Sequence, residues 1–365
     1  MPAAAIITVD ANTGPMEANI LKTLNRLEKR QINLALDPRK FALGRITGEV
    51  NEFNKSLEAS NARVIAFGAS AGLIAGVTRA FKSLVDVTID VEKQLADINV
   101  LLNLGGKELT TFGNKLFDVA KNTGQSFENV AEAAQEFARQ GLGVEETLKR
   151  TQDALILTRL TGLKAADAVE DLTAAVNTFK KEGLSTTDII NRLATVDASF
   201  AVSSKDLAEA ISRVGASAQD AGVNFNELIA IVTSVQQQTA RGGAVIGNAF
   251  KSIFTRIQRT DTQKQLEDLG IAVRDVEGNI RPALDILTDF ARVYDTLTPS
   301  IKASTAELLG GVFQINILKA AVSDLSKEYS TYKNALNVAN SATDEATRRN
   351  EKLNQTLGAD RKSVV

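Results

Sequence analysis

Apolar residues recur at intervals of three and four through most of this chain, which is the spacing of one face of an α-helix. The apolar stripes stop at glycines, among them Gly124, Gly141, Gly162, Gly183 and Gly222. Glycine readily adopts the left-handed backbone conformation that ends many helices. The pattern therefore predicts a mainly α fold, built as an extended multi-helix array of helical hairpins. Candidate core residues on the stripes are Phe127, Phe137, Leu155, Leu172, Phe179, Leu193 and Phe200.

The densest set of helix boundaries lies between residues 203 and 257. Ser203 with Asp206, and Asn224 with Glu227, each place an acid three residues after a small polar residue. In such a capping box, both side chains accept hydrogen bonds from free N–H groups at the start of a helix. The stretch therefore predicts two capped helices, and a third helix after Gly242-Gly243.

The glycines before this third helix invite comparison with a phosphate-binding loop. That interpretation fails, because Asn248 stands where a P-loop has Lys and no apolar strand comes before Arg241. We interpret Gly242-Gly243 as a helix entry with close packing. The basic residues that follow are interpreted as a solvated face, because they are not interleaved with aromatic residues as nucleic-acid-binding segments are. They are Lys251, Arg256, Arg259 and Lys264. Contact with DNA or with an acidic partner stays open as the alternative.

The C-terminal part holds a short turn and then the clearest periodicity of the chain. Ile271–Val273 and Asn279–Arg281 flank Asp275–Gly278, which predicts a short β-hairpin with Gly278 at positive φ. From Ile315 to Leu357, apolar or small residues follow at spacings of three and four without interruption, which is typical of a coiled coil. Candidate oligomer-interface residues on this seam are Ile315, Leu318, Val322, Leu325, Tyr329, Tyr332 and Leu336.

The N-terminal part has a different pattern. Two short apolar runs, Ala3–Val9 and Ile32–Leu36, predict a small β head with a helix between its strands. Gly68, Gly72 and Gly76 later repeat every four residues, which puts them on one helix face where identical copies can meet closely. We interpret this apolar stretch as a buried packing helix, because it is shorter than the ~20 residues that span a membrane. A membrane-active segment stays open as the alternative.

These patterns predict four regions. Residues 1–62 form a β/α head and an amphipathic helix, and residues 63–82 form the glycine-spaced apolar helix. Residues 83–312 form a helical core, and residues 313–365 begin a coiled coil.

The composition removes several kinds of chemistry. The chain has no Cys and no His, which excludes thiol nucleophiles, His-based triads and zinc sites of the N/S type. The acidic residues are scattered, so we expect no catalytic, cofactor-binding or metal site, although carboxylate chemistry stays open. The formal net charge of −2 provides no global field for nucleic acid, and we expect no specific nucleic-acid site.

The order of the central pieces resembles the core region of phage tail tape measure proteins. The resemblance covers residues 86–325 and rests on the order and spacing of several short motifs rather than on any single one. In this sequence the motifs are Ala221-Gly222-Val223, Arg241-Gly242-Gly243, Leu269-Gly270-Ile271, Gly278-Asn279-Ile280-Arg281-Pro282 and Leu308-Leu309-Gly310-Gly311.

The resemblance implies a structural protein of the virion tail, at the tip and in the lumen, made in the host cytoplasm, and not an enzyme. Copies would associate, as a homotrimer, and would bind tail hub or baseplate proteins, tail tube protein and tail assembly chaperones. The coiled coil would set tail length, and the protein would leave during genome ejection, with possible contact to the host membrane. Such proteins are usually much longer than this chain. A helical membrane-inserting toxin or secreted effector remains the alternative class.

Overall fold

A computed structural model describes residues 90–363, with side chains up to residue 355. The chain divides into two compact units, residues 1–96 with 104–114, and residues 97–103 with 115–365. The predicted β head and the glycine-spaced helix with Gly68, Gly72 and Gly76 lie outside the described residues. In the first unit the side chain of Leu95 packs against Gly113, where an added Cβ would come within 3.1 Å of it.

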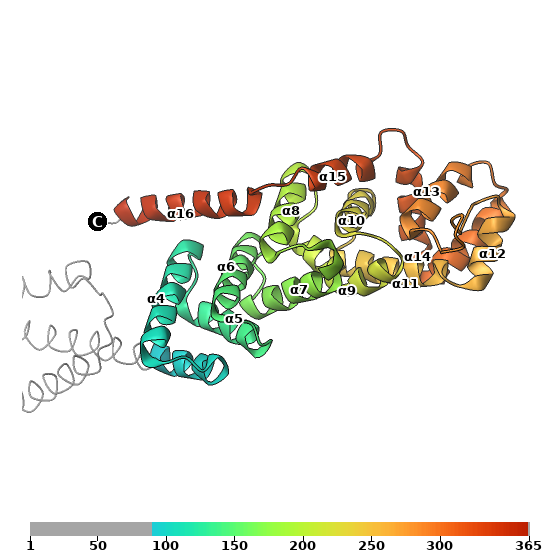
Figure 1. The fold of residues 1–365 in the computed structure, drawn as a ribbon. Helices are drawn as coiled ribbons and strands as arrows, with labels where there is room; N and C mark the ends of the chain where they lie inside the picture. The colour runs from blue at the N-terminus through green and yellow to red at the C-terminus, as the bar shows by residue number, and fades with distance from the viewer. Residues whose placement is uncertain (1–89, 364–365) are drawn as a thin grey trace, which may run out of the picture. The chain divides into compact units, whose positions relative to one another are not determined.

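The described part of the chain is mainly helical, as the apolar stripes predict (Figure 1). Its helices are α4 (Gly106–Thr123), α5 (Phe127–Arg139), α6 (Val144–Thr161), α7 (Ala165–Thr178), the 3-10 turn η1 (Lys180–Glu182), α8 (Thr186–Ser199), α9 (Ser204–Asp220), α10 (Phe225–Thr239), α11 (Gly243–Ile257), α12 (Thr260–Asp268), α13 (Ala283–Tyr294), α14 (Pro299–Leu325), α15 (Thr331–Asn340) and α16 (Glu345–Ser363). A further helical stretch covers residues 90–102.

Glycine ends the helices where the sequence predicts it. Gly124, Gly141, Gly162, Gly183 and Gly222 all adopt left-handed backbone, with φ between 65° and 77°. A residue with a Cβ adopts this region only with strain. The chain direction at each of these breaks is therefore fixed by the backbone itself.

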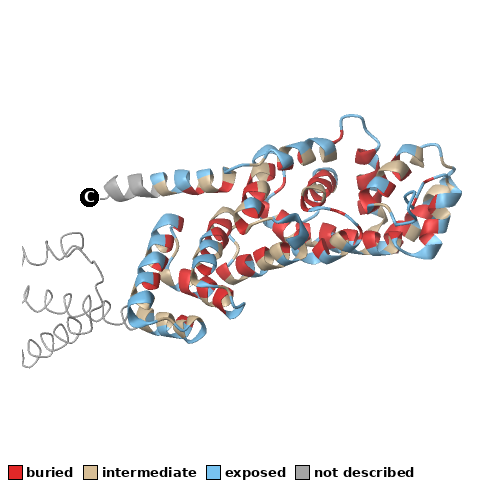
Figure 2. Ribbon diagram, viewed as in Figure 1, coloured by how far each residue is buried: buried red, intermediate tan, exposed pale blue. Residues whose placement is uncertain are grey.

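Helix α10 is the centre of the second unit. Its residues 228–235 are all buried, so the helix has no solvent-facing stripe over this length (Figure 2). Helices α8, α9, α11, α14 and α15 pack around it. The hairpin prediction describes α5 to α7, which pack on one another in sequence order, but α9 packs mainly against α11 rather than against α10.

The candidate core residues lie in or near this core. Phe137, Leu155, Leu172, Phe179 and Leu193 are buried, as predicted. Phe127 and Phe200 are half-buried. Phe179 also meets Phe225 of α10 edge to face, with ring centroids 5.4 Å apart.

The predicted β-hairpin is reduced to a turn. A single antiparallel bridge joins Arg274 and Ile280, and residues 90–363 contain no strand. Gly278 has φ 86°, as predicted. The carboxylate of Asp275 accepts hydrogen bonds from the backbone N–H groups of Glu277 and Asn279, at 3.0 and 2.8 Å. This side chain holds the turn together with a few backbone hydrogen bonds, such as those from Asp275 N–H to the carbonyl oxygen of Asn279 and from Arg281 N–H to that of Val273, both at 2.9 Å.

The C-terminal segment is not the one uninterrupted helix that the periodicity predicts, and its pairing as a coiled coil stays a prediction. The segment forms three helices, with breaks at residues 326–330 and 341–344. Helix α15 packs against α8 and α10, and α16 packs against α6 and α8. Burial against the chain's own core competes with a long free helix, and periodicity alone does not reveal which arrangement is more stable.

The candidate interface residues on the seam have mixed surroundings. Leu318, Val322 and Leu325 are buried within the chain itself. Ile315, Tyr332 and Leu336 are half-buried, and the side chain of Tyr329 is 84% exposed. Their role between copies stays a prediction.

Helix α14 breaks in its middle. Gly311 has φ 66° and ψ 169°, a conformation that is essentially restricted to glycine. In the described part of the chain, α14 is the helix that is long and apolar enough to cross a membrane, but half of its apolar window is buried inside the protein. The Leu308–Gly311 motif therefore marks a corner rather than the interior of a straight helix.

Candidate functional site

The closest helix crossing in the second unit joins α11 to α9. An added Cβ on Gly243 would lie 1.8 Å from the carbonyl oxygen of Asp206, and one on Gly247 would lie 2.8 Å from that of Ala210. Only hydrogen fits at these two positions. The structure confirms the interpretation of Gly242-Gly243 as a helix entry with close packing.

Asp206 fixes the start of α11 from the neighbouring helix. One carboxylate oxygen accepts from the backbone N–H of Gly243 at 2.9 Å, and the other accepts from Gln236 at 2.8 Å and from the Ser203 hydroxyl at 2.6 Å. Burial alone would raise the pKa of Asp206, yet hydrogen bonds from Ser203, Gly243 and Gln236 lower it below its usual value. The carboxylate is therefore ionised at the positive end of α11.

The two predicted capping boxes differ in outcome. Asn224 and Glu227 form a complete box at the start of α10, as predicted. The Ser203 side chain accepts from the N–H of Asp206, but the Asp206 carboxylate bonds to α11 instead of to the N–H of Ser203. The sequence predicts the local bond between Ser203 and Asp206, but it does not predict the long-range bond from Gly243 to Asp206.

Capping by a distant residue recurs through the unit. The N–H groups at the starts of later helices donate to polar side chains that come earlier in the chain. Ser204 of α9 donates to Asp197 (3.0 Å), Phe225 of α10 to Glu182 (2.9 Å), Tyr332 of α15 to Asp324 (2.8 Å), and Ala346 of α16 to Asn191 (2.9 Å). These bonds tie helices together at their ends, where packing alone is weakest.

A corner with exposed apolar side chains lies where α14 breaks. Arg256 of α11 donates to the carbonyl oxygen of Leu308 at 3.3 Å, and its guanidinium lies within 2.8 Å of the position that a Cβ on Gly311 would occupy. Immediately after the break, the side chains of Val312 and Phe313 are 67% and 93% exposed. Exposed aromatic side chains of this kind are typical of contact surfaces.

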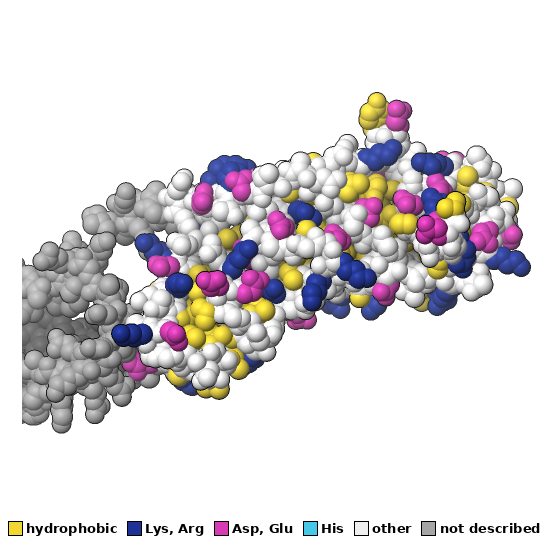
Figure 3. All heavy atoms as spheres, viewed as in Figure 1, with side chains coloured by type: hydrophobic (Ala, Val, Ile, Leu, Met, Phe, Trp, Pro, Cys, Tyr) yellow, Lys and Arg dark blue, Asp and Glu magenta, His cyan; other side chains and the backbone are white. Residues whose placement is uncertain are grey.

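The basic residues near this corner do not form one solvated face. Lys251, Arg259 and Lys264 are exposed, as predicted, whereas Arg256 is half-buried beside Gly311. On the face that Figure 3 shows, Lys and Arg are mixed with Asp and Glu over the described residues. No single-sign patch suited to nucleic acid gathers on that face.

Helix α16 is held mainly by polar groups. Arg159 of α6 donates to the side-chain oxygen of Asn350 at 2.9 Å, and Asn350 donates to the carbonyl oxygen of Asn122 at 2.8 Å. Arg349 lies 3.5 Å from the Asp197 carboxylate. Ala346 and Asn350 are the buried residues among the described side chains of this helix.

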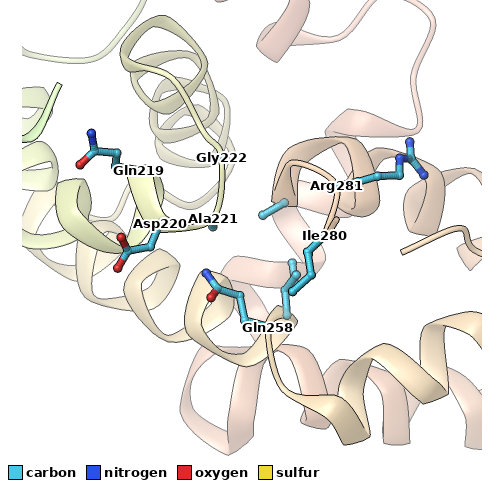
Figure 4. A pocket seen from close by; sticks show the side chains of 9 residues that line it. Gln219, Asp220, Ala221, Gly222, Gln258, Ile280 and Arg281 are labelled. Atoms are coloured by element: carbon cyan, nitrogen blue, oxygen red, sulfur yellow. The ribbon is translucent and has the colours of Figure 1, made fainter. Parts of the chain in front are cut away.

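A small hollow of about 180 Å³ lies where the ends of α9 and α11 meet the start of α13 (Figure 4). Gln219, Asp220, Gln258 and Arg281 supply its polar lining. Arg281 is paired with Asp289 at 2.9 Å, which neutralises the cation that an anionic ligand would need. We assign no ligand to this hollow.

Burial raises the pKa values of several carboxyl groups, among them Asp153 and Asp171. Burial raises the pKa of Asp153, which accepts from the hydroxyls of Thr186 and Thr187 at the start of α8. Burial, with the neighbouring acids Glu170 and Glu209, raises the pKa of Asp171 to about 6. Within residues 90–363, no group of three or more acidic side chains is placed to hold a metal ion.

Comparison with known proteins gives one family and one relative. The family described as "Phage-related minor tail protein" matches residues 106–311. A "Tape measure protein" of Pneumococcus phage Dp-1 is 22% identical over 237 residues, a region that is 63% of this chain and 20% of that protein. No solved structure matches. The family match begins at the first residue of α4 and ends at Gly311, where α14 breaks.

Proposed function

Since this chain belongs to the phage-related minor tail protein family, we propose that it is the N-terminal and core part of a tail tape measure. The family gives it a structural, non-enzymatic role as a component of the virion tail. The finer role is our proposal: the core nucleates tail assembly at the tip, a helical ruler sets tail length, and the protein leaves during genome ejection.

One observation carries this proposal. The family match covers the glycine-stopped helices and ends at the Gly311 corner. The similarity to the phage Dp-1 tape measure protein points the same way, although the matched region is only a fifth of that protein. The ruler segments and the partners that we assign to the whole protein are therefore part of the proposal.

The structure suggests how such a core would work. Helices with glycine-fixed breaks and capped ends make a rigid body, which is what an anchor at the tail tip requires. The exposed side chains of Val312 and Phe313 provide an apolar contact for hub or baseplate proteins. Copies associate, as three, and tube protein polymerises around the helix that continues beyond the corner.

The first experiment is mass spectrometry of purified tails from a phage or prophage that encodes this sequence. We expect peptides from residues 106–311 in stoichiometric amount, at a few copies per tail. Their complete absence from intact tails would contradict the proposal. The mass of the intact polypeptide then gives the length of ruler that accompanies the core.

The second experiment tests the ruler directly. Insertion of about 28 helix-forming residues after Glu351 adds about 40 Å of helix, and electron microscopy should show tails that are longer by the same amount. The matched control places the same insertion at Glu277, in the exposed turn. That insertion should leave tail length unchanged, and equal tail lengths for both insertions would refute a ruler that includes α16.

A further inference from the structure

The seam of the C-terminal segment keeps its phase through both structural breaks. Heptad positions run 3-4-3-4 from Ile315 to Leu357, and Tyr329 and Thr343, which occupy two of them, lie inside the breaks at 326–330 and 341–344. A loop that serves only to connect two helices has no need to preserve a heptad register. The register therefore fits a second arrangement in which the breaks are helical.

The breaks also lack any backbone feature that requires them. No Gly and no Pro occurs between residues 312 and 357. Ser326 has φ −70° and ψ −18°, which is helical, and Ser341 has φ −96° and ψ 4°, just outside the helical region. Ser330 is extended, with φ −86° and ψ 149°, and a change in ψ alone returns it to the helical region.

Side chains, and above all Asp324, hold the first break. Asp324 is 1% exposed, and its carboxylate accepts from the N–H groups of Thr331 and Tyr332, at 3.1 and 2.8 Å. It also accepts from the Ser234 hydroxyl of α10 at 2.7 Å. In a continuous helix these two N–H groups would instead donate to carbonyl oxygens four residues earlier.

From this we propose that residues 326–357 alternate between the observed folded-back arm and a continuation of α14 as one helix, which pairs with the same segment of a second copy. Asp324 is the clasp that keeps the arm closed. Helix α14 stays seated through Leu318, Val322 and Leu325, which are buried in the core. The released part would extend for about 50 Å at 1.5 Å per residue.

We take a second copy as the partner because the folded-back arm and the extended helix both bury the heptad seam of residues 326–357. Ala339 and Ala346 lie on the seam and are buried against the chain's own helices, so opening uncovers them together with the face of α10 that α15 covers. A partner must supply more free energy than this contact does. An identical seam offers matching heptads, and opening is therefore coupled to association. This inference rests on the proposed self-association only for the identity of the partner.

The experiment uses the full chain, which has no native Cys to interfere with labelling. Spin labels at Lys121→Cys and Glu351→Cys report the closed arm, because Asn122 and Asn350 beside them are hydrogen-bonded. The labelled chain that keeps Asp324 should give one short distance between the labels at positions 121 and 351 at low protein concentration. Asp324→Ala should increase the long-distance population about tenfold, because charge-assisted hydrogen bonds close the arm, and the increase should grow with concentration.

Two further variants and a second label pair keep the test specific. Ser330→Ala, which removes the hydroxyl that accepts from Lys333 N–H at 3.1 Å, should open the arm without disturbing Ser234, and serves if Asp324→Ala fails to fold. Glu328→Ala removes an exposed acid from the same loop and should leave the distances unchanged. Labels at Ser323 and Asn337 should give a narrow distribution near about 21 Å of backbone separation if the hinge becomes helical.

The inference is overturned if both clasp variants keep the short distance at all concentrations. It is also overturned if the arm opens but the Ser323–Asn337 distances are broad, which would indicate melting, or if light scattering shows monomers only. These outcomes are independent of the tail experiment. The chain can be absent from tails while its arms still pair, and it can be present in tails with an arm that never opens.

Discussion

The glycine-stopped core and the C-terminal arm, residues 326–363, break their helices by different means. In the core, Gly124, Gly162 and Gly222 adopt backbone conformations that other residues reach only with strain, although the break before α9 has no glycine and is held by Asp197. In the arm, every break uses ordinary backbone and is held by side chains such as Asp324 and Asn191. A break fixed by backbone has one geometry, whereas a break held by hydrogen bonds can be exchanged for a helix. The difference separates a rigid part of the molecule from a part that can be rearranged.

The core and the arm also differ in how much apolar side chain they bury. Helix α10 buries every residue from 228 to 235, and the core includes Phe179, Phe225 and Phe254. The arm buries Ala335, Ala339, Ala346 and Asn350 instead. Small and polar side chains remove little apolar surface from water, so the arm gains far less from burial than the core does.

The largest expected effect on stability comes from a glycine substitution in the core. Gly243→Ala puts a Cβ 1.8 Å from the backbone of α9, and neither backbone can move without disturbing α10. We expect a loss of about 3–5 kcal/mol in unfolding free energy, measured from the urea midpoint by circular dichroism.

The neighbouring glycine is the matched control for this substitution. A Cβ on Gly242 meets only the Asp206 carboxylate, at an ordinary 3.6 Å. Gly242→Ala should therefore cost less than about 1 kcal/mol, chiefly from the change of N-cap residue. Equal losses for the two variants would show that close approach of α11 to α9 is not what restricts position 243.

An intermediate effect is expected on the side-chain-held arm. Asn350→Ala removes the side-chain bonds to Arg159 and to the carbonyl oxygen of Asn122, each of which keeps Asn354 as a second partner, and it weakens the docking of α16 by about 1–2 kcal/mol. Hydrogen exchange of the α16 amides should become about 5- to 30-fold faster. Amides of α10 should keep their protection, because the core does not depend on the arm.

Replacement of the exposed neighbour, as Glu351→Ala, provides the reference for this experiment. It should leave exchange in α16 unchanged. If Asn350→Ala instead accelerates exchange in α10 as much as in α16, the arm and the core form one cooperative unit and the comparison fails.

The smallest effect concerns charge inside the core. The pKa of Asp171 is about 6, above its usual 3.8, so the folded chain holds this proton more tightly than the unfolded chain does. The ionised carboxyl therefore opposes folding, with its full cost above about pH 6, and this cost is relieved as the pH falls from about 6 towards 3.8. Asp171→Asn should raise stability at pH 7 by about 1 kcal/mol, after allowance for partial solvent screening.

The pH dependence itself is the check on this last prediction. Urea titrations of the variant and the unmodified chain should converge as the pH approaches 4. Glu145→Gln, at an exposed acid in the first turn of α6, should show no such convergence. A difference at Asp171 that stays constant with pH would assign the effect to packing instead of to charge.

Local features of the fold can be read from the sequence, and long-range ones cannot. The ends at Gly124 and Gly222 and the Asn224–Glu227 box depend on a few adjacent residues, and the structure confirms them. The corner at Gly311 was missed because a glycine pair in an apolar stripe also suits a continuous helix. Its signal is the preference of glycine for conformations that other residues avoid.

The arm shows where periodicity stops being informative. The heptads from Ile315 onward describe a buried face only in part, since Leu318, Val322 and Ala339 are buried whereas Tyr329 is exposed. They do not say what covers that face, because a partner helix and the chain's own α8 and α10 present similar apolar surfaces. The distant caps, such as Asp206 on α11, leave no local signal at all, since their spacing in sequence is set by the fold.

Those distant caps all run in one direction along the chain. Asp197, Glu182, Asp206, Asp324 and Asn191 each precede the helix whose N-terminus they bond. During synthesis on the ribosome, each new helix therefore emerges when the residue that completes its first turn is already available. The molecule can be built progressively from its N-terminal side, without waiting for later segments to finish earlier ones.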